Sequence, residues 1–236
     1  MLNQTYSFSP KRWALFCACV AVLVLVAYFR LDLPLTQLLN AERTPWVHDI
    51  FDVIDELGTS EYYLVPALLA YGYGLYRLSA MGGAAAASGR LRAERMARGG
   101  LFVIVTLAAG GAIVALLKAG VARARPELLI DHGIYGLGIP FMRVEDYNSF
   151  PSSHTFSAFG VAATLAILFP RIRWPLMIDS TGVAMARVIN LDHYFSDVVV
   201  SATLALVLAA FMAPLVLDAR HEWPLRSPWR WFARRR

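Results

Sequence analysis

The chain has 236 residues, of which 58% are hydrophobic and 17% charged, and its mean hydropathy is +0.51. These values exclude an ordinary soluble domain and indicate an integral membrane protein. The formal net charge is +5, but the basic residues follow the pattern expected of membrane topology and predict no nucleic-acid partner.

Six apolar segments occur along the chain, and a helix needs roughly 20 residues to cross the hydrocarbon core of a bilayer. The segments lie at about 13–29, 62–78, 99–117, 150–169, 174–191 and 194–217. The second is short, and Arg77 near its end would lengthen it by reaching toward the membrane interface. The sequence therefore predicts an all-α fold in which residues 1–236 form one domain, a polytopic bundle of six transmembrane helices.

The first segment has an alternative interpretation as a cleaved secretory signal, because Lys11 and Arg12 precede it. Its end, at residues 27–30, is bulky and offers no small-residue cleavage site. We therefore expect an uncleaved anchor. Cys17 and Cys19 lie inside this segment and are expected to be apolar packing residues, since the chain has no other cysteine to pair with.

Lysine and arginine are unevenly divided between the two sides of the six segments. Fifteen of the 22 fall on the side that carries both termini, and seven fall on the other side. The positive-inside rule then places both termini in the cytoplasm. Membrane lipids are expected partners, and contact of the basic C-terminal tail with anionic lipid is a weaker additional interpretation.

Two connections on the other side of the membrane are long. Residues 30–61 carry seven carboxylates, and Val53, Ile54 and Leu57 have helical spacing, which predicts an amphipathic segment on the membrane surface. Residues 119–149 form the longest connection without an apolar span, and such loops are more often functional than idle.

Lys118 and Arg125 are seven residues apart where the third segment ends. A helix that continued past the segment would turn both side chains to nearly the same face, until Pro126 ended it. Two converging cations suit a phosphate, because arginine gives planar bidentate hydrogen bonds and lysine a compact charge. For this pair alone, snorkelling at the interface is the simpler alternative.

Pro151, Ser152, Ser153 and His154 open the fourth segment. Proline suits the first turn of a helix, and the free N–H groups of that turn form an anion site that serine hydroxyls supplement. His154 would stand beside this site and exchange a proton near neutral pH. Taken alone, an ordinary serine-rich helix start with an interfacial histidine has the same sequence.

Arg187 ends the fifth segment, His193 opens the sixth, and Asp197 lies one helical turn beyond His193. This spacing places the carboxylate and the imidazole on one helix face, where Asp197 accepts from one ring nitrogen and leaves the other basic. Such an arrangement is typical of an activated nucleophile. A packing hydrogen bond for Asp197 and an interfacial role for His193 are the alternatives, and they are weaker for the two residues together beside an arginine.

The three patterns Lys118-x6-Arg125-Pro126, Pro151-Ser152-Ser153-His154 and Arg187-x5-His193-x3-Asp197 resemble, in order, the signature motifs of the type 2 phosphatidic acid phosphatase superfamily. With the six-span layout, the resemblance covers nearly the whole chain. It implies a membrane phosphatase that needs no metal or other cofactor.

The resemblance also implies a role for each motif residue. His193 would attack phosphorus, Asp197 would orient it, and His154 would protonate the departing oxygen and then activate water. The phosphate would be held by the cations and by the serine-containing helix start, namely Lys118, Arg125, Arg187, Ser152 and Ser153.

Two positions depart from the family pattern. Ser153 replaces the usual glycine, which matters if the backbone there needs a positive φ, and Ala186 replaces the usual serine, which removes one hydroxyl donor. Two further carboxylates have no role in the motifs. We expect Asp179 to be an interhelical hydrogen-bond partner and Asp192 to be a solvated loop carboxylate.

The sequence thus predicts a phosphatase of lipid phosphates or diphosphates at the outer face of a bacterial inner membrane, with its active site periplasmic or extracellular. Candidate substrates are undecaprenyl diphosphate, phosphatidylglycerol phosphate, phosphatidic acid and lipid A phosphates. One alternative is a non-catalytic lipid-phosphate binder or transporter, which would not need an oriented nucleophile. Another is a vanadate-dependent haloperoxidase, a class that is soluble, whereas this chain is not.

Overall fold

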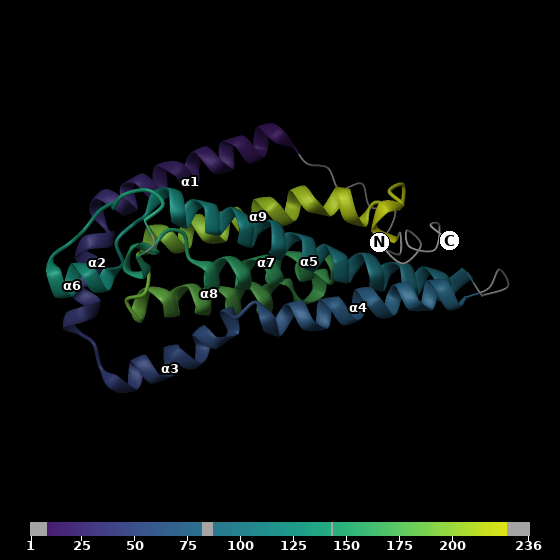
Figure 1. Ribbon diagram of the computed structural model, residues 1–236, viewed down its shortest axis with the longest axis horizontal. Coiled ribbons are helices and arrows are strands. Elements are labelled where there is room, and N and C mark those ends of the chain that lie inside the picture. Colours follow the sequence, from purple (N-terminus) through teal and green to yellow (C-terminus); the bar gives the residue numbers. More distant parts are fainter. Residues whose placement is uncertain (1–8, 82–86, 143, 226–236) are drawn as a thin grey trace.

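The computed structural model describes residues 9–81, 87–142 and 144–225, and within these ranges the regular structure is helical throughout. The longer helices run lengthwise through an elongated molecule, and α2 crosses its end (Figure 1). They are α1 (Pro10–Arg30), α2 (Asp32–Ala41), α3 (Pro45–Asp55), α4 (Glu61–Ala80), α5 (Ala87–Val121), α6 (Pro126–His132), α7 (Ser153–Leu168), α8 (Arg173–Ile189) and α9 (Phe195–Leu217). Short 3-10 turns lie at η1 (Glu56–Gly58), η2 (Glu145–Tyr147), η3 (Pro170–Ile172) and η4 (Trp223–Leu225).

The expected all-α class is confirmed, and each of the six apolar segments coincides with one helix. Three helices, α1, α5 and α9, are long and apolar enough to cross a membrane, and α7 is a shorter apolar helix. The helix of the third segment starts at Ala87, well before residue 99. That six helices cross the membrane remains a prediction.

The centre of the bundle is formed by α5, α7 and α9, which pack along one another. A glycine makes this approach possible: a Cβ at Gly110 of α5 would lie 1.7 Å from the ring of Phe156 on α7. Close packing also joins α4 to α5, because a Cβ at Gly100 would lie 2.5 Å from the carbonyl oxygen of Ala67. Small residues thus allow helices to approach closely where the surrounding lipid gives no hydrophobic drive for association.

The periphery of the bundle is loosely packed and apolar. Of the residues in α1 only Ala27 is buried, and Figure 1 shows α1 diverging from the bundle toward its N-terminal end. An apolar cavity of about 800 Å³ lies between α4, α5 and α7, and no residue of the three motifs lines it. This exposed apolar surface suits a lipid environment.

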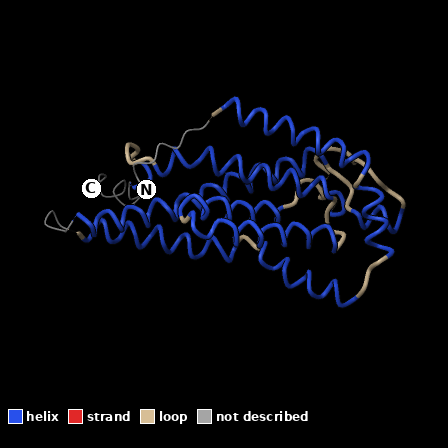
Figure 2. The backbone as a smooth tube through the Cα atoms, turned by 180° about the vertical axis from the view of Figure 1, so that it is seen from behind, coloured by secondary structure: helices blue, strands red, loops and turns tan. Residues whose placement is uncertain are grey.

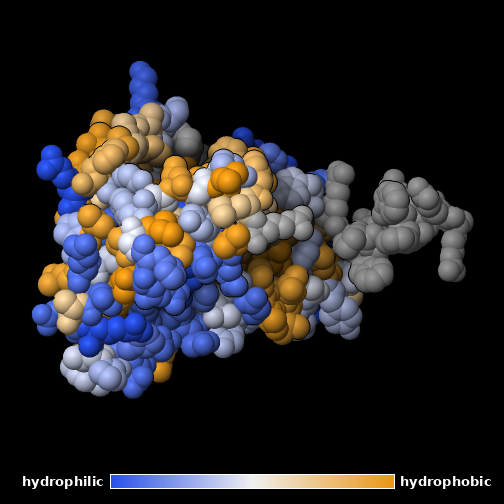
Figure 3. All heavy atoms as spheres, turned by 60° about the vertical axis from the view of Figure 1, so that its left-hand side comes forward, coloured by the Kyte–Doolittle hydropathy of each residue, from blue (hydrophilic) through white to orange (hydrophobic). Residues whose placement is uncertain are grey.

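The two ends of the molecule differ. The start of α1 and the end of α9 lie toward one end of the molecule, and most loops gather at the other end (Figures 1 and 2). Hydrophilic side chains are concentrated on this loop-bearing end (Figure 3). The segment expected to be amphipathic is α3 followed by η1, with Leu57 in the 3-10 turn, and both pack against α8. Val53 and Leu57 are exposed, and the position of this segment on the membrane surface stays a prediction.

Candidate active site

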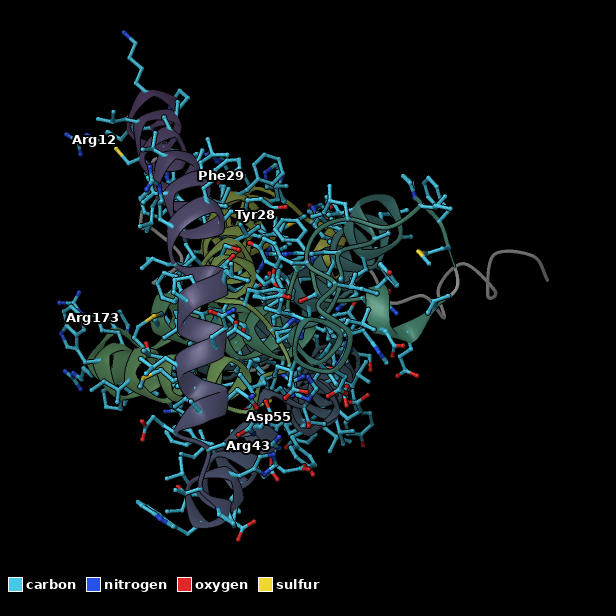
Figure 4. The ribbon with its side chains drawn as sticks, turned by 90° about the vertical axis from the view of Figure 1, so that its left-hand side faces the viewer. Arg12, Tyr28, Phe29, Arg43, Asp55 and Arg173 are labelled. Carbon is cyan, nitrogen blue, oxygen red and sulfur yellow. The ribbon has the colours of Figure 1, made fainter. Side chains whose placement is uncertain are left out.

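The three motifs meet at the loop-bearing end of the bundle. Lys118 lies in the last turn of α5, His154 in the first turn of α7 and Arg187 in the last turn of α8, while His193 lies between α8 and α9. Figure 4 looks onto this end: Asp55 appears near the middle of the view, whereas Arg12 and Arg173, at the far starts of α1 and α8, appear at its edge. Antiparallel helices therefore bring residues distant in sequence to one place.

The first motif is not carried by one continuous helix. The helix ends at Val121, because Ala122 has a φ of +48° and turns the chain out of the α-region. A new helix, α6, begins at Pro126 with Arg125 at its N-cap. The expected continuation to Arg125 was therefore wrong. Lys118 and Arg125 reach the site from two helices, and Lys118 donates to the carbonyl of Asn148.

The second motif forms the start of α7. Pro151 precedes the helix instead of lying in its first turn, and the buried Ser152 is the N-cap, whose Oγ accepts from the N–H of Thr155 at 3.3 Å. Ser153, the first helical residue, is exposed and does not have the positive φ that would favour glycine. The departure to serine therefore introduces no backbone strain.

His193, the expected nucleophile, is 3% exposed. Its Nδ1 lies 2.5 Å from the carbonyl oxygen of Ser149 and 3.8 Å from Oδ2 of Asp197. The proton on Nδ1 is therefore donated to Ser149, because 3.8 Å is too long for a hydrogen bond. This bond fixes the neutral tautomer and leaves the lone pair on Nε2.

The protonation state of His193 also suits a nucleophile. Burial lowers the pKa of His193 to about 3, with nearby Asp197 opposing the shift and the cations Arg187 and Lys118 adding to it. The imidazole is therefore neutral near pH 7, as a nucleophile must be.

Asp197 is fully buried, and its carboxylate accepts from three donors. Its Oδ2 accepts from Ser149 Oγ at 2.6 Å and from the N–H of Tyr194 at 3.0 Å, and its Oδ1 accepts from Arg123 at 2.5 Å. The expected direct hydrogen bond from His193 is absent from these contacts. Asp197 and His193 are linked instead through Ser149, which contacts both.

The two arginines of the motifs, Arg125 and Arg187, are paired with carboxylates. Arg187 Nη1 lies 2.5 Å from Asp55 and 3.3 Å from Asp192, and Arg125 lies 3.9 Å from Asp192. Asp192 was expected to be solvated, but burial raises its pKa, with Arg187 and Arg125 opposing the shift. Nε of Arg125 and Nε of Arg187 are buried without a partner among the described residues. These donors remain available to an anion.

His154 is partly accessible, with 38% of its side chain exposed. Its Nε2 lies 4.0 Å from Oδ2 of Asp55. The turn η1 packs against it so closely that a Cβ at Gly58 would lie 2.7 Å from its Cβ. The imidazole is thus packed against η1 on one side and partly exposed.

Sequence reasoning missed several residues of this site. Asp32, Arg123 and Ser149 are buried beneath His193, and Asp52 and Asp55 come from α3, where Asp52 accepts from Asn190 at 2.8 Å. One signal was available: Arg123 is a third cation within the first motif. The contacts of the three aspartates are long-range and have no local pattern.

Two lesser expectations also have outcomes. Asp179 is exposed, and no hydrogen bond to its carboxylate forms within the described ranges, so its interhelical role was wrong. The contact between α7 and α8 is made instead by Ser180, whose Oγ donates to the carbonyl of Ala158 at 3.0 Å. Ala186, which replaces the usual serine of the family pattern, is fully buried.

The chain is similar to known membrane phosphatases. Residues 99–220 match the PAP2 superfamily. Lipid A 1-phosphatases from Rhizobium etli and Rhizobium johnstonii are each 27% identical, over 192 and 193 residues. Each alignment covers 78% of this chain, and 77% and 73% of the respective relative.

Two solved structures share the fold. A PAP2 type phosphatidylglycerolphosphate phosphatase from Bacillus subtilis has a TM-score of 0.60 at 18% identity, covering 89% of this chain and 96% of that one. Aquifex aeolicus LpxE has a TM-score of 0.54 at 22% identity, covering 79% and 96%. The family match spans more than half of the chain and includes all three motifs. The chain therefore belongs to the PAP2 superfamily, as its motifs predicted.

Proposed function

We propose that this protein is a metal-independent lipid phosphate phosphatase that works through a phosphohistidine on His193. The observation that carries the proposal is the state of this residue: it is buried and neutral, and its Nδ1 is committed to Ser149. A phosphate binder needs the cations of the site but not a histidine with one nitrogen held basic. Catalysis explains this arrangement better than binding alone.

In the first step, Nε2 of His193 attacks phosphorus and the bond from phosphorus to the lipid oxygen breaks. The departing oxygen takes a proton from His154, which therefore enters the step as the imidazolium. Burial and the cation Arg187 lower the pKa of His154, and Asp55, 4.0 Å from its Nε2, opposes this shift. The negative charge of a bound phosphate would act in the same direction as Asp55 and favour the imidazolium. In the second step, neutral His154 removes a proton from water, the resulting oxygen attacks phosphorus, and the bond to His193 breaks.

The phosphoryl oxygens are held by Lys118, Arg125 and Arg187, with the hydroxyl of Ser153 and the free N–H groups at the start of α7. These donors surround charge that grows in the transition state, where fixed donors are most effective. Ser152, which caps α7, keeps those N–H groups in place. Asp55 and Asp192 pair with the arginines and would move off them as the more highly charged phosphate enters.

Lipid A phosphate is the first substrate to test, because the curated relatives at 27% identity are lipid A 1-phosphatases. The decisive assay measures phosphate release by purified protein from lipid A, undecaprenyl diphosphate, phosphatidylglycerol phosphate and phosphatidic acid. We expect release from at least one lipid, undiminished by a metal chelator. No release from any of them, or activity that returns only with added magnesium, would contradict the proposal.

We also propose that the site faces the periplasm or the exterior and that both termini are cytoplasmic. The uneven division of lysine and arginine supports this orientation, as does the position of the helix ends near the two termini at the end of the bundle opposite the motifs (Figure 1). A reporter that works only in the cytoplasm should be active when fused after Arg236, and inactive when inserted near Asp131, in α6. The reverse pattern would move the active site to the cytoplasmic face.

A further inference from the structure

Four buried side chains beneath the nucleophile form one hydrogen-bonded cluster, which we call the buried node: Asp32, Arg123, Ser149 and Asp197. Each is at most 2% exposed. The first comes from α2, the last from α9 and the other two from the loops after α5 and before α7. Asp32 lies outside residues 99–220, the part of the chain that matches the family.

Ser149 connects the node to the nucleophile. Its carbonyl accepts from Nδ1 of His193, and its Oγ donates to Oδ2 of Asp197 at 2.6 Å. Its N–H donates to the carbonyl of Arg123 at 3.1 Å. The N–H and the Oγ of Ser149 each make a hydrogen bond, and these two bonds hold in place the carbonyl that accepts from His193.

Arg123 connects the node to the N-terminal part of the chain. It donates to Oδ1 of Asp197 at 2.5 Å and to Asp32 at 2.8 Å, and its guanidinium lies 4.2 Å from the ring centroid of Tyr194 and 4.8 Å from that of Tyr28. Asp32 also accepts from the N–H of Ser196 at 3.0 Å, at the start of α9. The planar guanidinium of Arg123 thus joins α2 and α9 to the loop after α5.

The charges of the node are mutually dependent. Burial opposes the charge of Arg123, but Asp197 and Asp32 more than compensate, so that the pKa of Arg123 is raised. With Oδ1 of Asp197 held by this permanent cation, Oδ2 is directed at Ser149. Without Arg123 the carboxylate would be a buried, uncompensated charge free to seek other donors, including the imidazole itself.

We infer that Asp32, Arg123 and Ser149 are positioning residues for the nucleophile: they hold the Ser149 carbonyl against Nδ1 of His193 and thereby keep Nε2 unprotonated. The inference rests on the proposed attack by His193. None of the three residues touches phosphate, so their substitution lowers kcat and leaves KM in place.

The first test removes one hydroxyl. Ser149→Ala frees Asp197 from the residue that holds the imidazole, and we expect kcat to fall about tenfold, at the lower end of the effects seen for partners that orient a histidine. The matched control is Ser180→Ala, which deletes a hydroxyl that is also buried and hydrogen-bonded, between α7 and α8. An unchanged kcat in Ser149→Ala, or an equal loss in the control, would overturn the inference.

The second test removes Asp32 and Arg123 together, so that Asp32 is not left as a buried charge while Asp197 loses its cation. The double variant Asp32→Asn/Arg123→Gln should lose kcat by about 100-fold at unchanged KM, whereas Arg98→Gln, at an equally buried arginine, should keep its kcat. If the double variant fails to fold, Asp32→Asn alone, which leaves Arg123 in place, takes over with a smaller expected loss in the same direction. A KM effect without a kcat effect, in either variant, would contradict a positioning role.

The third measurement is independent of catalysis. Nitrogen-15 NMR of histidine-labelled protein distinguishes a protonated Nδ1 from a protonated Nε2, and His193→Ala assigns the signal. We expect the Nδ1–H form in the parent and in Ser180→Ala, and a loss of that preference in the double variant or in Asp32→Asn. The same tautomer in all of them would overturn the inference. Absence of a phosphoenzyme in the parent would instead contradict the proposed function and leave this readout intact.

Discussion

Two arginines with the same low exposure, 2%, lie toward opposite ends of the molecule and have different partners. Arg98 donates to three backbone carbonyls, those of Val216, Asp218 and His221, at 2.7 to 3.1 Å. Arg123 donates to the carboxylates of Asp32 and Asp197. One end of the bundle thus pairs a buried cation with neutral acceptors, and the other pairs it with charges.

The two buried cations serve different parts of the structure. The carbonyls around Arg98 belong to the end of α9 and the chain after it, so Arg98 satisfies acceptors that a helix end leaves unpaired. Of the carboxylates around Arg123, Asp197 is linked through Ser149 to His193, the proposed nucleophile. Burial alone therefore does not distinguish the two arginines, whereas their hydrogen-bond partners do.

The largest expected effect is at the nucleophile. His193→Ala should lower turnover by about 10⁴-fold or more, because without Nε2 no covalent step remains. Phosphate release from the preferred lipid measures this. Turnover within about tenfold of the parent, in a folded variant, would exclude covalent catalysis by His193.

A smaller loss is expected at the phosphate-binding cations. Arg187→Ala should lower kcat by about 10²- to 10³-fold, the effect of removing one donor to the developing charge. Arg187→Lys should recover part of the lost kcat, since lysine keeps the positive charge but lacks the planar guanidinium. Arg171→Ala is the control, because Arg171 is exposed in η3, away from the motifs. A loss in the control as large as that in Arg187→Ala would attribute the effect to surface charge.

The buried imidazole should also make stability depend on pH. The pKa of His193 is lowered to about 3 in the folded protein, so the unfolded chain binds one more proton between about pH 3 and pH 6.5. Stability is therefore lost as the pH falls through this range, by about 2 kcal/mol at pH 5 relative to pH 7.5. Thermal unfolding in detergent should show this loss in the parent and not in His193→Gln. An equal loss in both would mean that His193 is charged in the folded protein.

The smallest effect on activity is expected at the opposite end. Arg98→Gln should lower the free energy of unfolding by about 1–3 kcal/mol, because buried carbonyls at the end of α9 lose their donor. Its kcat should stay near that of the parent. A large loss of kcat in this variant, with the fold retained, would show that the two ends of the bundle are not functionally distinct.

Sequence reasoning reached those residues whose chemistry has a local pattern. The cations and histidines of the motifs, such as Lys118 and His154, were found because a charge at the end of an apolar helix is conspicuous. The partners of these residues were not found. Asp32 lies 91 residues from Arg123 along the chain, and Asp55 lies 132 residues from Arg187, so no spacing rule relates them.

Local geometry set a second limit on prediction. The helical spacing of His193 and Asp197 predicted a direct hydrogen bond, but α9 begins only at Phe195. His193 therefore precedes the helix, and the carbonyl of Ser149 takes its Nδ1 proton. The break at Ala122 was equally unpredictable, because alanine is an ordinary helix residue and its positive φ is set by the surrounding loop.

Covalent catalysis by His193 is tested by trapping the phosphoenzyme in His154→Ala. With an aryl phosphate whose phenol is a good leaving group, attack by His193 does not need the proton of His154, but hydrolysis of the intermediate still needs its base. We predict a burst of phenol and an acid-labile phosphate label on His193 in this variant. Both should be absent from His193→Ala. Phenol released without a burst and without label on the protein, or label on another residue, would contradict covalent catalysis by His193.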